Sequence, residues 1–126
     1  FALFDLDHFK RINDTYGHSV GDRALVDVGS LLREQVGELG KVARWGGEEF
    51  AVLFAGVGLE EARRCSERVR LAVERLDCSA FAPGWKMSIS GGVAERTGLA
   101  HYERRVSRAD TLLYDAKREG RNCIRG

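Results

Sequence analysis

The stretch KVARWGGEEFAVLF, at residues 41–54, decides the fold of this chain. Residues 41–45 and 50–54 are two short runs dominated by apolar and aromatic side chains, and the pair Gly46-Gly47 lies between them. Two such runs around a diglycine are typical of a β-hairpin. Residues 41–54 therefore predict two adjacent antiparallel strands in the middle of the sequence.

Helices and further strands are predicted on both sides of this hairpin. Residues 1–7 are an apolar run that ends in acids, as expected of a buried strand, and residues 85–95 and 122–124 predict two more strands. Apolar side chains recur at helical spacing over residues 20–32, 59–76 and 102–119, and residues 8–17 have helix-like content. Ser19 and Asp22 fit a capping box at the start of the helix around 20–32, and Gly37 fits its end.

The resulting order, β-α-α-β-β-α-β-α-β, predicts the fold class. It favours an α/β (α+β) sandwich of ferredoxin-like type, in which helices flank a mixed, mainly antiparallel sheet. A length of 126 residues fits one domain with one hydrophobic core.

Composition excludes several classes of function. The net charge is only +1, so no overall field draws the chain to nucleic acid or to an anionic membrane. No apolar run is long enough to span a bilayer. The three cysteines, Cys65, Cys78 and Cys123, have no metal-ligand spacing, and we interpret them as reduced thiols of a cytoplasmic protein.

Two pairs of acids are the candidate chemical groups. Asp5 and Asp7 end the first predicted strand, and Glu48 and Glu49 follow the diglycine. If the strands are neighbours, Asp5 faces the hairpin glutamates, and such oxygen ligands suit Mg²⁺. Solvated loop acids are the alternative. The diglycine likewise fits either the close approach of a phosphate or ribose, or a plain turn.

Five blocks of the sequence, in order, resemble one family. RWGGEEF at 44–50 is similar to the signature of GGDEF-domain diguanylate cyclases in its GGEEF variant. The resemblance implies a nucleotidyl-cyclase fold of polymerase-palm type, with residues 1–126 as a single GGDEF domain excised from a longer chain and lacking the family's amino-terminal segment. The other blocks are DLDHFK at 5–10, N-D-x-x-G-H-x-x-G-D at 13–22, SISGGVA at 88–94 and A-D-x-x-L-Y-x-A-K-x-x-G-R-N at 109–122.

The resemblance also implies the metal ligands and the catalytic groups. Asp5, Glu48, Glu49 and the carbonyl of Leu6 would hold two Mg²⁺ ions, with Mn²⁺ as a substitute. Glu48 or Glu49 would instead activate the attacking 3′-hydroxyl. Glu48 is the glutamate we expect to matter more, and the division of labour between the two stays open.

Substrate contacts follow from the same resemblance. Asn13 and Asp22 would read the guanine of GTP, with a turn and a helix cap as their structural alternatives. The residues that would hold the triphosphate lie at the start and the end of the chain. They are Lys10, the backbone N–H groups near His8 and Phe9, the close approach at Gly46 and Gly47, and Lys117 and Arg121, four apart on a predicted helix face.

One family feature is absent. The R-x-x-D inhibitory site ends five residues before the diglycine in many members, and here Gly37 and Gly40 stand at its two charged positions. We therefore expect no allosteric inhibition at that site, while cyclic di-GMP is left to compete with GTP in the active site.

The predicted reaction joins two GTP molecules into cyclic di-GMP across a homodimer, under the control of regulatory domains in a parent protein whose membrane anchoring stays open. Neither nucleic acid nor direct membrane contact is expected. The alternatives are a non-catalytic module that binds GTP or cyclic di-GMP, an RNA-binding ferredoxin-like domain, and a cyclase acting on ATP. The apolar strand at 51–54 disfavours RNA binding, and Asp22 disfavours ATP.

Overall fold

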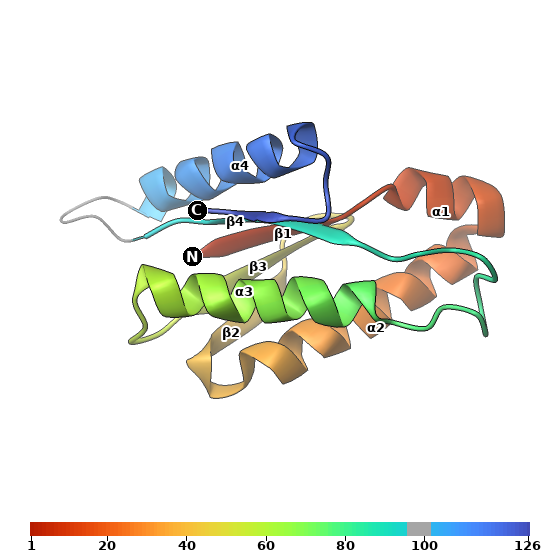
Figure 1. Cartoon of the computed structure of the whole chain (residues 1–126), viewed down its shortest axis with the longest axis horizontal. Helices are drawn as coiled ribbons and strands as arrows, with labels where there is room; N and C mark the ends of the chain where they lie inside the picture. The colour runs from red at the N-terminus through yellow and green to blue at the C-terminus, as the bar shows by residue number, and fades with distance from the viewer. Residues whose placement is uncertain (96–101) are drawn as a thin grey trace.

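The computed structural model describes residues 1–95 and 102–126, with side chains for 1–95 and 106–126. Five strands form one sheet in the order β2-β3-β1-β4-β5 (Figure 1). The elements are β1 (Ala2–Leu6), α1 (Phe9–Tyr16), α2 (His18–Val36), the 3-10 turn η1 (Gly37–Leu39), β2 (Gly40–Arg44), β3 (Glu49–Phe54), α3 (Leu59–Glu74), β4 (Ile89–Val93), α4 (Tyr102–Arg118) and β5 (Ile124–Arg125).

Strand β1 is the centre of the sheet. It pairs antiparallel with β3, where Asp5 lies opposite Glu49, and antiparallel with β4, where Asp5 lies opposite Ser90. The β2–β3 pair is the predicted hairpin, and β4 and β5 run parallel. The predicted mixed, mainly antiparallel sheet flanked by helices is therefore confirmed.

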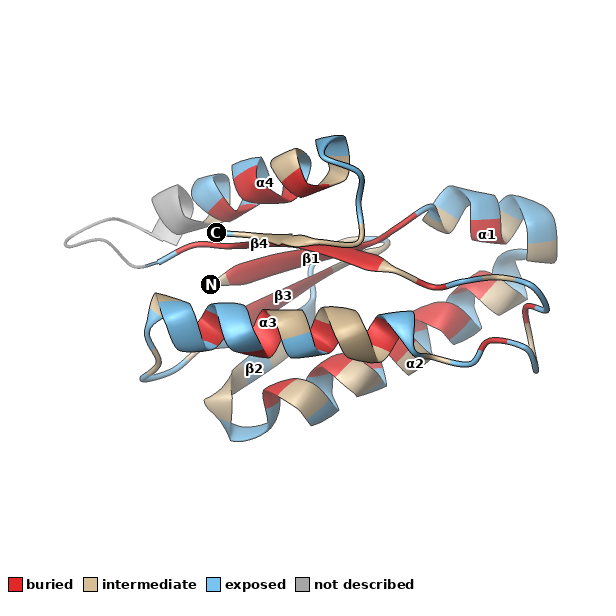
Figure 2. Cartoon of the chain, in the orientation of Figure 1, coloured by how far each residue is buried: buried red, intermediate tan, exposed pale blue. Residues whose placement is uncertain are grey.

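The helices cover the two faces of the sheet unequally. Helices α2 and α3 lie on one face, α4 lies on the other, and α1 projects beyond the end of β1 (Figure 1). Because side chains alternate along β1, Phe4 and Leu6 belong to the large core cluster that also contains residues of α2 and α3. Leu3 packs with residues of α4, and Asp5 shares the face of Leu3. Figure 2 shows β1 buried along its length.

Helix α4 approaches the sheet very closely at Gly92. A Cβ atom on Gly92 would lie 2.2 Å from the carbonyl oxygen of Ala109 and 2.5 Å from the amide nitrogen of Leu113. Real side chains do not accept such distances, so only glycine lets α4 lie this near β4. The close approach brings the end of α4 within reach of β1.

Three predicted boundaries were wrong. Helix α2 begins at His18 with Gly17 as its N-cap, so Ser19 and Asp22 do not form a capping box. Its predicted end at Gly37 is confirmed. Strand β4 covers only 89–93, because the chain turns at Gly84 (φ 83°) and the Trp85 amide bonds back to Ala82. The last strand starts at 124, since Asn122 is left-handed (φ 47°).

None of the helices within the described ranges has the length and apolar character needed to cross a membrane.

Candidate active site at the end of strand β1

Asp5 is the central acid of the site. Its side chain is 7% exposed, and its carboxylate accepts a hydrogen bond from the Lys117 ammonium of α4. Burial raises the pKa of Asp5 to about 6, although Lys117 acts in the opposite direction, and the charges of Glu48 and Glu49 raise it further. Asp5 is thus a carboxylate in a crowded negative site that is only partly neutralised.

Asp7 looks similar in the sequence but has a different environment. It accepts hydrogen bonds from the hydroxyls of Ser88 and Ser90, both at 2.7 Å, and from the backbone N–H of Asn122 at 3.0 Å. With three donors it is satisfied by the protein itself. Asp7 therefore ties β1 to β4 and to the turn before β5, a structural role that the sequence did not reveal.

The diglycine turn is held by Arg44. Its guanidinium donates to the carbonyl oxygens of Gly46 at 3.2 Å and Gly47 at 2.5 Å, and the Leu6 amide donates to the backbone carbonyl of Glu48 at 3.1 Å. Neither glycine has a left-handed φ, and a Cβ atom on Gly47 would meet nothing within 4 Å. The turn itself thus does not require glycine at position 47, and its outer side is open.

The turn from β1 into α1 presents backbone amides. His8 is the N-cap of α1 in a left-handed conformation (φ 56°), and its carbonyl accepts the first helical hydrogen bond, from Ile12. The N–H groups of the first helical turn have no partner within a helix, and a helix start favours anions. Phe9 and the exposed Lys10 occupy this turn, close to Asp5 along the chain.

Phe9 and Asn13 of α1 converge on Gly21 of α2. A Cβ atom on Gly21 would lie 1.8 Å from Asn13 Oδ1 and 3.3 Å from Phe9 Cζ. Asn13 Oδ1 is buried and has no hydrogen-bond partner. The structure therefore brings Asn13, Phe9 and the neighbour of Asp22 together, although they come from different helices.

The structural alternatives for Asn13 and Asp22 are not realised. Asp22 lies inside α2, is exposed, and does not cap the helix, which begins four residues earlier. Asn13 lies inside α1, and it is its backbone carbonyl, not its side chain, that bonds to Gly17. Both polar side chains are left available to a ligand.

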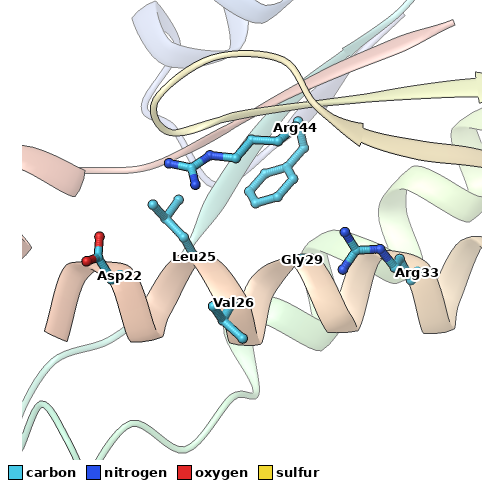
Figure 3. Close-up of a pocket in the computed structure, with 7 residues that line it drawn as sticks. Asp22, Leu25, Val26, Gly29, Arg33 and Arg44 are labelled. Carbon is cyan, nitrogen blue, oxygen red and sulfur yellow. The ribbon is translucent and has the colours of Figure 1, made fainter. Parts of the chain in front are cut away.

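A groove of about 250 Å³ extends from Asp22 along α2. Figure 3 shows Asp22 and Arg33 at its two ends and the guanidinium of Arg44 reaching over it from the hairpin. Neither arginine is among the site residues predicted from the sequence. For Arg44, its position two residues before the diglycine is the feature of the sequence that could have indicated a role at the turn. The rest of the lining is Leu25, Val26, Gly29 and Phe50.

Lys117 and Arg121 do not share a helix face, so this prediction was wrong. Helix α4 ends at Arg118, Gly120 has φ 122°, and Arg121 is left-handed with φ 64°. The Arg121 amide bonds to the Ala116 carbonyl, and its side chain is exposed in the turn after the helix. Of these two cations, Lys117 is the one that bonds to β1, through its ion pair with Asp5.

The carboxylates fit a divalent cation by their chemistry. Within the described ranges, no three His, Cys, Asp or Glu side chains are already gathered as a metal cluster, and Lys117 is the cation beside Asp5. Nevertheless Glu48 and Glu49 raise the pKa of Asp5, so the site has excess negative charge on hard oxygen ligands, as Mg²⁺ prefers.

Comparison with known proteins agrees with this geometry. The chain is 42% identical over 125 residues to "Diguanylate cyclase DgcP" of Pseudomonas aeruginosa. This alignment covers 98% of this chain and 18% of that protein. It superimposes with a TM-score of 0.92 and 30% identity on the active GGEEF domain of a diguanylate cyclase from Vibrio cholerae, covering 98% of this chain and 79% of that one. The GGDEF domain of DgcB from Caulobacter crescentus, solved in complex with c-di-GMP, superimposes with a TM-score of 0.91 and 34% sequence identity. This match covers 98% of this chain and 74% of that one.

This chain spans only 18% to 36% of the length of the first curated relatives it matches. The family described as "Diguanylate cyclase, GGDEF domain" matches residues 1–123. With the strand-end acids, the open diglycine turn and the matching fold, the chain belongs to the GGDEF-domain family of diguanylate cyclases.

Proposed function

We propose that this domain condenses two GTP molecules into cyclic di-GMP and two pyrophosphates. The observation that carries the proposal is Asp5, a buried carboxylate whose pKa is raised to about 6 beside two glutamates and an open diglycine turn. A site that is only partly neutralised costs stability, and a divalent cation with its polyphosphate would satisfy it.

Asp5, Glu48, Glu49 and the Leu6 carbonyl would hold Mg²⁺ or Mn²⁺, two ions per site, which supply charge neutralisation on the phosphates. Glu48 or Glu49 would take the proton of the attacking 3′-hydroxyl. The 3′-oxygen then bonds to the α-phosphorus, and the bond from that phosphorus to the bridging oxygen breaks to release pyrophosphate. Arg44 keeps the turn that carries both glutamates in one conformation.

Substrate binding would use both ends of the chain. Asn13 and Asp22 would bind the guanine, and Lys10 with the backbone amides after His8 would bind the triphosphate. Lys117 and Arg121 would add charge from α4 and the turn that follows it. Charge-assisted hydrogen bonds of this type contribute about 1.5–3 kcal/mol each.

Two facing domains are needed, because closing the ring takes two phosphodiester bonds and each domain would bind one GTP. We propose that the longer protein is cytoplasmic at this domain and that its other domains control the pairing. Cyclic di-GMP would compete with GTP through the groove that begins at Asp22 and carries Arg33 and Arg44.

Inhibition at a separate R-x-x-D site is not proposed. Glycines stand where the site would have its Arg and Asp. Gly37 has φ 52°, and a Cβ atom on Gly40 would lie 2.5 Å from the Leu53 carbonyl oxygen. An aspartate at position 40 would therefore require the β2–β3 pair to shift.

The test is to incubate the purified domain with Mg²⁺ and GTP and separate the nucleotides by chromatography, with the Glu48→Gln variant as control. We expect cyclic di-GMP from the unmodified domain and none from the variant. Bound GTP that is never converted, at any protein concentration, would favour the non-catalytic module instead.

A further inference from the structure

The side chain of Asn13 occupies the space that a side chain at position 21 would need. A Cβ atom on Gly21 would lie 1.8 Å from Asn13 Oδ1 and 2.9 Å from Asn13 Cγ, far closer than real Cβ contacts. Gly21 is buried in α2 and its own amide is bonded to Gly17, so the backbone cannot move aside cheaply. Only glycine at this position leaves the Asn13 amide where it is.

The contact also decides which end of the amide faces inward. Asn13 Oδ1 is buried without a hydrogen-bond partner, whereas Nδ2 is not enclosed in this way. The Cα–H group of glycine is a weak donor that suits an oxygen, and an NH₂ group in the same place would bury two unpaired donors. Asn13 therefore keeps its acceptor against α2 and leaves its donors for a ligand.

Asp22, the next residue of α2, offers only acceptors when ionised. A donor from Asn13 beside acceptors from Asp22 complements guanine, which has an acceptor at O6 and donors at N1 and the 2-amino group. Adenine has the reverse order, with a donor at N6 and an acceptor at N1. We infer that Gly21 is a specificity-determining residue that selects guanine by fixing the orientation of the Asn13 amide. This inference rests on the proposed role of Asn13 and Asp22 in base recognition.

The experiment compares Gly21→Ala, Asn13→Ala and the double variant, with Ser30→Ala on the exposed side of α2 as a helix-propensity control. The probes are 3′-deoxy-GTP and 3′-deoxy-ATP, which lack the attacking hydroxyl and cannot react. We expect Gly21→Ala to weaken binding of the guanine probe by roughly 3- to 10-fold, about one neutral hydrogen bond, and to leave the adenine probe unchanged. The double variant should bind no more weakly than Asn13→Ala.

Thermal unfolding gives a second, independent measurement. Gly21→Ala should lower the melting temperature when Asn13 is present. In the Asn13→Ala background it should not, because the clash with Asn13 is then gone. The remaining tight neighbour, Phe9 Cζ at 3.3 Å, has to give by only a few tenths of an ångström, which the better helix propensity of alanine offsets. Additive losses in the double variant, or wild-type guanine selectivity in Gly21→Ala, would overturn the inference while leaving the proposed function intact. An unmodified domain that binds neither probe would contradict the proposed function, and the stability coupling would still test the contact.

Discussion

Asp5 lies in strand β1 and Asp7 directly after it, and the two carboxylates have different environments. Asp7 accepts three hydrogen bonds from the chain itself, whereas Asp5 has one cation, Lys117, against two glutamates. A carboxylate that the protein satisfies internally stabilises the fold. One that is left in excess negative charge is instead available for chemistry, at a cost to the stability of the free domain.

The free domain should lose stability as pH rises through the titration of Asp5. The folded pKa of about 6 lies above the ordinary value of 3.8, so the folded state holds this proton while the unfolded chain has released it. Asp5 thus favours folding below about pH 4, and that contribution is lost as pH rises to about 6. Asp5→Asn should remove this loss, so the difference in unfolding free energy between variant and wild type should grow between pH 4 and 6.

Urea unfolding in EDTA at several pH values measures this difference, and a constant difference across the range would contradict it. At neutral pH the same variant should be at least as stable as wild type and should form no cyclic di-GMP. A residue whose removal stabilises the domain but abolishes turnover is one retained for function.

At the scale of elements, Gly92 of β4 and Gly47 of the hairpin turn differ in how much space surrounds the missing side chain. Gly92 has no room for a side chain because the backbone of α4 lies against it, whereas Gly47 has open space around its missing Cβ. The first glycine is required by the fold. The second is not required by the space around it, and we expect it to admit a substrate group that approaches the turn from outside.

Gly47→Ala should therefore change stability by less than about 0.5 kcal/mol, the usual range for surface substitutions, and should strongly reduce formation of cyclic di-GMP. Denaturant unfolding and the chromatographic assay measure the two effects. Normal turnover in this variant would show that no substrate group approaches the turn at position 47.

Gly92→Ala is the matched comparison for Gly47→Ala, because here the added methyl group has no room. A methyl group 2.2 Å from the Ala109 carbonyl oxygen must push α4 away from β4, and overpacking of this type costs about 1–3 kcal/mol. Because α4 carries Lys117, the variant should also weaken the Lys117–Asp5 pair. A stability equal to that of Gly47→Ala would mean that α4 adjusts without strain.

At the scale of the whole molecule, the order of strands and helices could be predicted because apolar periodicity is local information. The convergence of Asp5 with the hairpin glutamates was also predicted, and the β1–β3 register confirms their proximity. Other features depend on contacts between distant segments. The hydrogen bonds of Asp7, the reach of Arg44 and the exclusion at Gly21 could not be predicted from spacing, since each is set by how helices and strands pack in space.

The end of helix α4 shows a second reason why some features could not be predicted from the sequence. Residues 117 and 121 have helical spacing, but the left-handed turn at 120–122 separates them. The sequence contained the glycine that ends the helix, but not the direction that the chain takes after it.

Cyclic di-GMP formation by this domain should rise more steeply than linearly with protein concentration, because two domains must meet for each product. Initial rates over a hundredfold range of concentration measure this, with nucleotide in excess. A mixture of Asp5→Asn and Asn13→Ala domains should show no recovery if each facing site must be complete. A strictly linear dependence would mean that the domain is already paired at the lowest concentration or acts alone, and analytical ultracentrifugation separates these cases.

The bonds around Asp5 and Asp7 also determine when the site can form during synthesis. Lys117 is 112 residues from Asp5, and Asn122 is 115 residues from Asp7. Contacts of such sequence separation form late, because a long loop must close first. A nascent chain that already displays the diglycine hairpin still lacks the partners of both aspartates. The candidate site at Asp5 is therefore completed only after residues 117–122 have left the ribosome.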